Sequence, residues 1–302
     1  MTATAIAALL IILASWGLKA AGVLRRDAAP ILIQIVLYLT LPALVFRIMA
    51  TSELHTSLLL VPVVGMITHV VLVGVAWAVC RAGGASRATT GAVIIACAVG
   101  NTGFFGVPLI AASGAHLSLP AAVMFDTFCT GILTWTSTFW ISAHYGERAG
   151  SGPSAGPMWR NLLLPPTWAM AAGLLVNALG VDLPDGVIRP LEILGAAVLP
   201  LVLVYAGLVI EWGGVRRAWR GVCTATVIRL GVSPLVALAV AAALGLEGDV
   251  LRTVVLMAAM PTAMMSLVIG GWYRVNTDVI AGSVVVTALL APVVLPVLRA
   301  VL

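Results

Sequence analysis

Ten apolar stretches occupy most of the 302-residue chain, and each is long enough to cross a bilayer as a helix, which takes about 20 residues. Hydrophobic residues make up 62% of the sequence and charged residues 9%, against roughly 45–50% and 25% in ordinary soluble domains. This composition excludes a soluble enzyme. We predict an all-α polytopic membrane protein with ten transmembrane helices, at about residues 3–23, 30–50, 58–80, 88–112, 117–143, 161–180, 187–210, 219–245, 250–273 and 279–301.

The most loop-like segment lies near the middle of the chain. Residues 146–158 are rich in glycine, serine and proline, which is typical of a flexible connector. We therefore predict a first five-helix unit at 1–145, a connector at 146–160 and a second five-helix unit at 161–302.

Basic residues are distributed unequally between the two sides of the predicted bundle. The odd-numbered connections hold eleven of them, namely Lys19, Arg25, Arg26, Arg81, Arg87, Arg148, Arg160, Arg216, Arg217, Arg220 and Arg274. The even-numbered connections hold three, namely Arg47, Arg189 and Arg252. The positive-inside rule then places the odd connections and the 146–160 connector in the cytoplasm. We expect a plasma membrane protein, in bacterial terms an inner membrane protein, with both termini outside the cytoplasm.

Five helices in each half give the halves opposite topologies if they are homologous. The motif LPALV at 41–45 recurs as LPLVL at 199–203, an offset of 158. A shift of 160 aligns NTGFFG at 101–106 with PTAMMS at 261–266. These matches favour an inverted repeat.

Sequence signatures of common enzyme classes are missing. The chain has no GxxxxGK[ST] phosphate-binding loop, and none of its four histidines is followed by glutamate, so it has no HExxH zinc site. We predict no enzymatic activity, no cofactor and no metal site. We also predict no nucleic-acid partner, since the basic residues are scattered between apolar runs. Four cysteines without a CxxC pair are interpreted as buried small hydrophobes.

Helix-disfavouring residues interrupt the fourth and ninth predicted spans. In the fourth, Gly100, Gly103, Gly106 and Pro108 surround Asn101 and Thr102; in the ninth, Pro261 stands beside Thr262, with Ser266 one turn later. Matched interrupted helices in two halves indicate a transporter's binding site, because half-helix amino termini attract anions. The competing interpretation is a pair of plain proline kinks. We predict substrate binding by Asn101, Thr102, Gly103, Pro108, Pro261, Thr262 and Ser266.

Two formal charges lie well inside predicted spans, Asp126 in the fifth and Arg229 in the eighth. Each costs at least about 2.5 kcal/mol at a helix centre, so each should face a partner or an aqueous cavity. Under the offset of 160, Arg229 corresponds to His69 in the third span. We predict that Arg229 attracts or neutralises an anion, and that Asp126 or His69 couples transport to protons or pairs with Arg229. A purely structural pair is the alternative.

Motifs along nearly the whole chain resemble the auxin efflux carrier family, which includes plant PIN transporters and bacterial malonate and malate permeases. The motifs, in order, are GVLRR at 22–26, LPALVF at 41–46, GNTGFFGVPL at 100–109, LGAAVLPL at 194–201 and MPTA at 260–263. The short connector resembles prokaryotic members rather than plant ones.

The resemblance implies two inverted five-helix repeats similar to those of bile-acid sodium symporters and sodium/proton antiporters. Helices 1, 2, 6 and 7 would form a scaffold and dimerise through helices 2 and 7. Helices 3–5 and 8–10 would form a mobile transport domain, in which helices 4 and 9 cross at Asn101, Pro108 and Pro261. Ala263, Met264 and Met265 leave the second crossover poor in oxygen ligands, which argues against a dedicated sodium site.

The sequence therefore predicts a secondary transporter for a small organic anion, such as malonate, malate or an auxin-like acid, working by an elevator mechanism. Two alternatives stay open. The first is a sodium- or proton-coupled symporter or antiporter of the same fold. The second is a membrane sensor that binds a ligand without transporting it.

Overall fold

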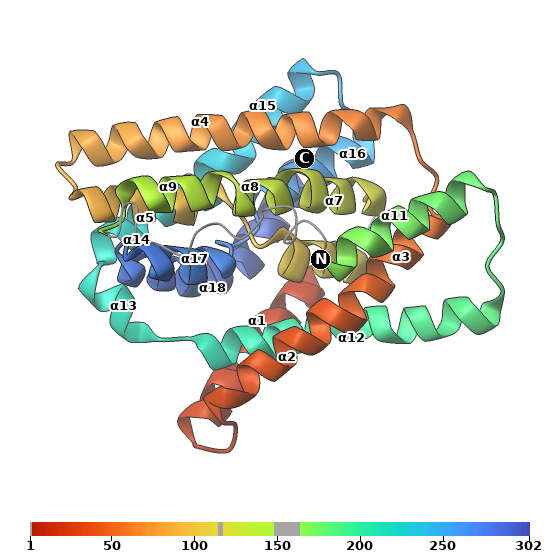
Figure 1. Ribbon diagram of the computed structural model, residues 1–302, viewed down its shortest axis with the longest axis horizontal. Helices are drawn as coiled ribbons and strands as arrows, with labels where there is room; N and C mark the ends of the chain where they lie inside the picture. Colours follow the sequence, from red (N-terminus) through yellow and green to blue (C-terminus); the bar gives the residue numbers. More distant parts are fainter. Residues whose placement is uncertain (1, 114–116, 148–163) are drawn as a thin grey trace.

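The computed structural model describes residues 2–113, 117–147 and 164–302, and the regular structure of these residues is helical (Figure 1). Five of the segments are long and apolar enough to cross a membrane, as expected for a polytopic membrane protein: Ala29–Thr51, Thr56–Ala82, Asp185–Val209, Trp219–Ala243 and Thr277–Val301. From residue 148 onward, the predicted connector at 146–160 lies outside the described residues.

The helices of the first half are α1 (Thr2–Ala20), α2 (Ala29–Ile35), α3 (Leu41–Thr51), α4 (Val61–Ala82), α5 (Arg87–Ala98), α6 (Val107–Ala112), α7 (Leu119–Phe125), α8 (Ile132–Trp135) and α9 (Ser137–Tyr145). Those of the second half are α11 (Pro165–Ala178), α12 (Asp185–Val209), α13 (Trp212–Arg217), α14 (Trp219–Val227), α15 (Ser233–Ala243), α16 (Gly248–Ala258), α17 (Met265–Tyr273) and α18 (Thr277–Val301). Two 3-10 turns, η1 (Arg26–Ala28) and η3 (Thr56–Leu60), precede α2 and α4.

Four wider π-helical turns continue directly into the helix that follows. They are η2 (Val36–Thr40), η4 (Thr102–Gly106), η5 (Asp126–Gly131) and η6 (Ile228–Val232). All except η4 also continue the helix before them. Pro42, Pro108 and Pro234 each stand two residues after the end of such a turn. The residue before each of these prolines donates its N–H to the carbonyl five residues back. A proline removes one backbone donor and crowds the preceding turn, and the wider turn accommodates it.

Two groups of helices pack against each other. In the first group α3 packs on α11 and α12, and α1 packs on α12; in the second, α4 packs on α5 and α15, and α18 packs on α5, α13 and α14 (Figure 1). Glycines permit the closest approaches in the first group. A Cβ at Gly173 would lie 2.7 Å from the carbonyl oxygen of Phe46, and one at Gly207 would lie 2.5 Å from that of Ile12.

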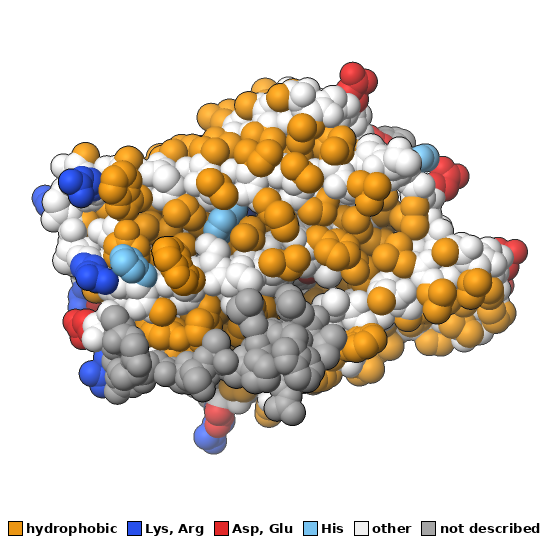
Figure 2. Space-filling view, turned by 45° about the horizontal axis from the view of Figure 1, so that its top comes forward, with side chains coloured by type: hydrophobic (Ala, Val, Ile, Leu, Met, Phe, Trp, Pro, Cys, Tyr) orange, Lys and Arg blue, Asp and Glu red, His pale blue; other side chains and the backbone are white. Residues whose placement is uncertain are grey.

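One face of the molecule is covered by hydrophobic side chains through its middle, with most Lys and Arg towards one end and most Asp and Glu towards the other (Figure 2). Such a face suits contact with lipid. Cys80, Cys97 and Cys129 are buried, but Cys223 is exposed, so the interpretation of all four cysteines as buried was wrong for Cys223. An apolar run in a membrane helix does not distinguish the lipid-facing side from the core.

Candidate functional site

The site begins where two helices are broken at matching places. The helix α5 ends at Ala98 and η4 begins at Thr102, while α16 ends at Ala258 and α17 begins at Met265. The two extended segments run antiparallel, with Gly100 opposite Thr262.

Each break supplies hydrogen-bond partners to the other. The N–H of Asn101 donates to the carbonyl of Pro261 at 2.6 Å, and the N–H of Ala263 donates to the carbonyl of Val99 at 3.1 Å. Unwound backbone inside a membrane is tolerated only where protein or water satisfies it. The crossing therefore stabilises both breaks.

The carboxyl end of α5 is capped by side chains from three other segments. The last four carbonyls of a helix lack intrahelical donors, and in α5 these belong to residues 95–98. The side-chain partners are Ser266 Oγ to Ile95 O at 3.4 Å, Thr262 Oγ1 to Ala96 O at 2.8 Å, Arg229 Nη1 to Cys97 O at 3.2 Å and His69 Nδ1 to Ala98 O at 3.2 Å. Four predicted site residues thus serve one helix end.

The carboxyl end of α16 shares one of these donors. Arg229 Nε donates to the carbonyl of Met260 at 2.7 Å, and Ser233 Oγ donates to that of Ala258 at 2.7 Å. The guanidinium of Arg229 therefore bridges both broken helices. Arg229 is only 3% exposed, so this bridge lies inside the protein.

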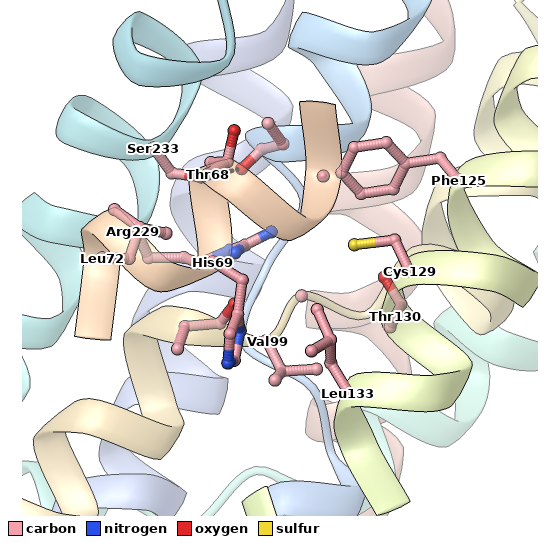
Figure 3. Close-up of a pocket in the computed structure, with 14 residues that line it drawn as sticks. Thr68, His69, Leu72, Val99, Phe125, Cys129, Thr130, Leu133, Arg229 and Ser233 are labelled. Atoms are coloured by element: carbon pink, nitrogen blue, oxygen red, sulfur yellow. Dashed lines mark hydrogen bonds between the residues drawn. The ribbon is translucent and has the colours of Figure 1, made fainter. Parts of the chain in front are cut away.

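A small cavity of about 10 Å³, room for about one water, lies beside this bridge. Figure 3 shows Arg229 and Ser233 entering it from one side, His69 from α4, and Cys129 and Thr130 from the η5 turn. His69 is held at both ring nitrogens, since Nε2 lies 2.7 Å from Ser137 Oγ. Because the carbonyl of Ala98 can only accept, Nδ1 carries a proton.

A second cavity, of about 450 Å³, lies at the amino-terminal ends of the half-helices. Residues 100–104 and 263–265 supply its walls from the two breaks, and residues 126–128, 130–132, 134 and 135 from the fifth span supply more. Leu37, Leu41, Leu164, Pro166 and Thr167 complete the lining from the first packing group. The cavity thus lies between the two groups of helices. Gly100 and Thr130 line both cavities.

Most polar groups on the wall of the larger cavity come from the fourth and fifth spans. Thr102 Oγ1 donates to Asp126 Oδ1 at 2.6 Å, and a Cβ at Gly103 would lie 2.8 Å from Asp126 Oδ2. The carboxylate therefore rests against the first turn of η4. The side-chain amide of Asn101 makes no hydrogen bond to any other described residue, so its donors are available to a molecule in the cavity.

The predicted site residues thus fall into separate sets. Asn101, Thr102, Gly103 and Asp126 line the larger cavity, whereas His69, Arg229, Thr262 and Ser266 cap α5. Pro108 is the second residue of α6, and Pro261 supplies a carbonyl at the crossing. Within the described residues, no carboxylate lies within 4 Å of the Arg229 guanidinium, so neither Asp126 nor any other acid pairs with it there.

Several lining residues carried no sequence signal. Phe104, Phe128 and Trp135 are not among the predicted site residues, yet they provide aromatic walls to the larger cavity. Ser233 and Thr287, whose Oγ1 accepts from the N–H of Thr262 at 2.9 Å, support the crossing. For Ser233, the neighbouring Pro234 inside an apolar span was a sequence signal of an irregular turn.

Sequence comparison finds relatives along nearly the whole chain. Residues 1–149 and 155–299 match the family described as membrane transport protein. An uncharacterized transporter of Methanothermobacter thermautotrophicus is 29% identical over 298 residues, which cover 98% of this chain and 96% of the relative. An uncharacterized transporter of Methanocaldococcus jannaschii is 24% identical over 286 residues, which cover 92% of this chain and 91% of the relative. These relatives are named as transporters, not as enzymes. The chain belongs to this membrane transport protein family, the auxin efflux carrier family that its motifs resemble.

Proposed function

We propose that the protein is a secondary transporter that carries a small organic anion. One observation carries the proposal: the amino-terminal ends of both half-helices, at Thr102 and Met265, reach the same cavity of about 450 Å³. A helix amino terminus has unpaired N–H groups and about half a positive charge, and it favours carboxylates. Asn101 adds two side-chain donors at the same place.

The lining of the cavity favours an anion with an apolar body. Phe104, Phe128, Trp135, Met264 and Met265 line the cavity together with its polar residues. A compact dicarboxylate such as malonate would leave a second charge against these walls, which is costly. A carboxylate with an aromatic or aliphatic body, as in an auxin-like acid, would bury that body there instead. The sequence left both substrate classes open, and the lining of the cavity supports the carboxylate with an apolar body.

Asp126 would make anion binding depend on pH. Its carboxylate accepts from Thr102 at the end of η4 where the substrate carboxylate would bind. Two anions at one helix end repel each other, so a proton on Asp126 would favour substrate binding. We therefore propose coupled entry of proton and anion, with Asp126 as the coupling residue. His69 is the less suitable candidate because it is engaged at both nitrogens with Ala98 and Ser137.

The location of the larger cavity between the two packing groups supports an elevator mechanism. We propose that the first packing group, α1, α2–α3, α11 and α12, is the scaffold of the predicted ten-helix inverted repeat, and that α4–α9 and α14–α18 form the moving domain. The cavity wall that contains Asn101, Thr102 and Asp126 belongs to the moving domain and would carry the anion across the membrane. Dimerisation through the second and seventh spans, both termini outside the cytoplasm, and location in the plasma membrane belong to the same proposal.

A thermal-shift screen of purified protein tests the anion site. Aromatic and aliphatic monocarboxylates and short dicarboxylates are compared, at two pH values, on the wild type and on Asn101→Ala. A ligand at 100 times its Kd stabilises the folded state by about 2.7 kcal/mol, so a bound substrate raises the melting temperature. We expect apolar monocarboxylates to stabilise the wild type and to lose this effect in Asn101→Ala.

Flux measurements in proteoliposomes separate the remaining alternatives. Uptake of the stabilising acid would establish transport, whereas binding without uptake would identify a sensor. A melting temperature that changes with sodium or pH but with none of the acids would favour a cation exchanger of the same fold.

A further inference from the structure

The carboxyl ends of the two broken helices meet around a positively charged side chain. Arg229 donates to Cys97 O at the end of α5 and to Met260 O just beyond the end of α16. In secondary transporters with discontinuous helices, unwound carbonyls and half-helix carboxyl ends coordinate the coupling sodium ion or proton. In this protein a guanidinium group occupies the corresponding position.

The charges at this position balance without an acidic side chain. Each helix carboxyl end carries about half a negative charge, so two such ends together offset roughly one positive charge. No carboxylate of the described residues lies within 4 Å of Arg229. The guanidinium is buried, and among the described residues its hydrogen-bond partners are carbonyls only, as for a coordinated cation.

The surrounding backbone is shaped to receive this group. Arg229 lies in the π turn η6, which lets the chain pass Pro234 and sets the position from which the side chain projects. A Cβ at Gly100 would overlap Arg229 Nη2 and would lie 2.7 Å from Cζ. Glycine at position 100 therefore leaves the space that the guanidinium fills.

We propose that Arg229 is a resident cation that takes the place of a coupling sodium ion at the helix crossing. Anion transport should then require no sodium, and removal of the Arg229 side chain should leave a site for a free cation of matching shape. This inference rests on the proposed anion transport. It assigns Arg229 a positioning role at the crossing rather than contact with the anion, because Arg229 does not line the larger cavity.

The first experiment uses wild-type protein in proteoliposomes. Uptake of the acid identified by thermal shift is measured with sodium, and again with sodium replaced by potassium or choline. We expect equal rates. A loss of uptake without sodium would overturn the inference while leaving the proposed anion transport intact; absence of uptake of any acid in every medium would overturn the proposed function itself.

The second experiment is chemical rescue of Arg229→Ala. The fraction of monodisperse protein, the melting temperature and uptake are measured with and without guanidinium chloride at a low, non-denaturing concentration. We expect uptake to fall by more than about tenfold, since two charge-assisted hydrogen bonds are lost, and to recover in part with guanidinium. The melting temperature should rise with guanidinium in Arg229→Ala only. Arg189→Ala, at an exposed arginine, serves as the matched control.

The outcomes decide the question. Full uptake by Arg229→Ala without guanidinium, or a folded variant that guanidinium leaves unchanged, would overturn the resident cation. If Arg229→Ala does not fold, Arg229→Lys and Arg229→Gln decide instead. Lysine keeps the charge and should retain uptake, whereas glutamine keeps only hydrogen bonding and should lose it. Equal uptake by both would also overturn the proposal.

Discussion

The hydroxyl of Thr102 donates to the carboxylate of Asp126 at 2.6 Å, at the first turn of a half-helix that opens into the larger cavity. An internal anion thus occupies the helix end that would attract an external one. The Arg229 guanidinium provides the complementary charge at the opposite, carboxyl-terminal ends of the broken helices. Both charged groups are positioned by the crossing of two unwound segments.

Asp126→Asn should bind the substrate anion more tightly and lose its pH dependence. In the wild type, lower pH protonates the carboxylate and removes its repulsion, so affinity should rise as pH falls. The amide has no charge at any pH, and we expect its affinity at neutral pH to exceed the wild type's by about tenfold, a difference of 1.4 kcal/mol. Thermal-shift titrations at several pH values check this. Asp249→Asn, at an exposed acid, is the control; unchanged pH dependence in Asp126→Asn would contradict the coupling role.

Gly100→Ala should destabilise the folded protein. The new Cβ would overlap the Arg229 guanidinium, which is held by two carbonyls and cannot move without losing them. Overpacking of this kind costs typically about 1–3 kcal/mol. Gly74→Ala provides the comparison, because a Cβ there meets nothing within 4 Å. Melting temperatures measured by size-exclusion chromatography should fall for the first variant and hold for the second.

Thr262→Val should weaken the crossing of the broken helices. The substitution keeps the side-chain shape but removes the donor to Ala96 O at the end of α5. A buried carbonyl left unsatisfied costs about 1–3 kcal/mol. Thr224→Val is the matched control, since the Thr224 hydroxyl bonds only to its own helix at an exposed position. Hydrogen exchange at residues 99–101 should quicken in Thr262→Val alone, and slow exchange there would refute the capping role.

Trp135→Ala should change substrate preference more than stability. The indole ring lines the larger cavity, where it would contact the apolar body of the acid. We expect the affinity for aromatic monocarboxylates to fall by about tenfold, the equivalent of one stacking contact. Short dicarboxylates that do not reach this wall should be unaffected. Competition assays with both classes provide the measurement, and an equal loss for both would argue against an apolar body at this wall.

Much of the architecture follows from sequence patterns that act locally. Apolar runs of about 20 residues must be helical in a bilayer, because helices satisfy their own backbone there. Pro42, Pro108 and Pro234 each impose a wider turn just before them. Gly100, Asn101 and Pro261 marked the two breaks, since neither proline nor glycine favours an uninterrupted helix. These properties depend on neighbours within one or two turns.

The roles of the polar residues depended on tertiary structure. Asn101, Asp126, Arg229 and Thr262 all lie inside apolar spans. From sequence, Asn101, Thr262 and Arg229 were assigned to the anion, and Asp126 to proton coupling or to pairing with Arg229. In the folded protein Asn101 and Asp126 line the larger cavity, whereas Arg229 and Thr262 cap α5 from the eighth and ninth spans. A polar residue in a membrane helix needs a polar partner or water. Its presence therefore predicts that the side chain is buried, but it does not identify the partner. Only the packing of distant helices decides between a ligand, a carbonyl and a carboxylate as that partner.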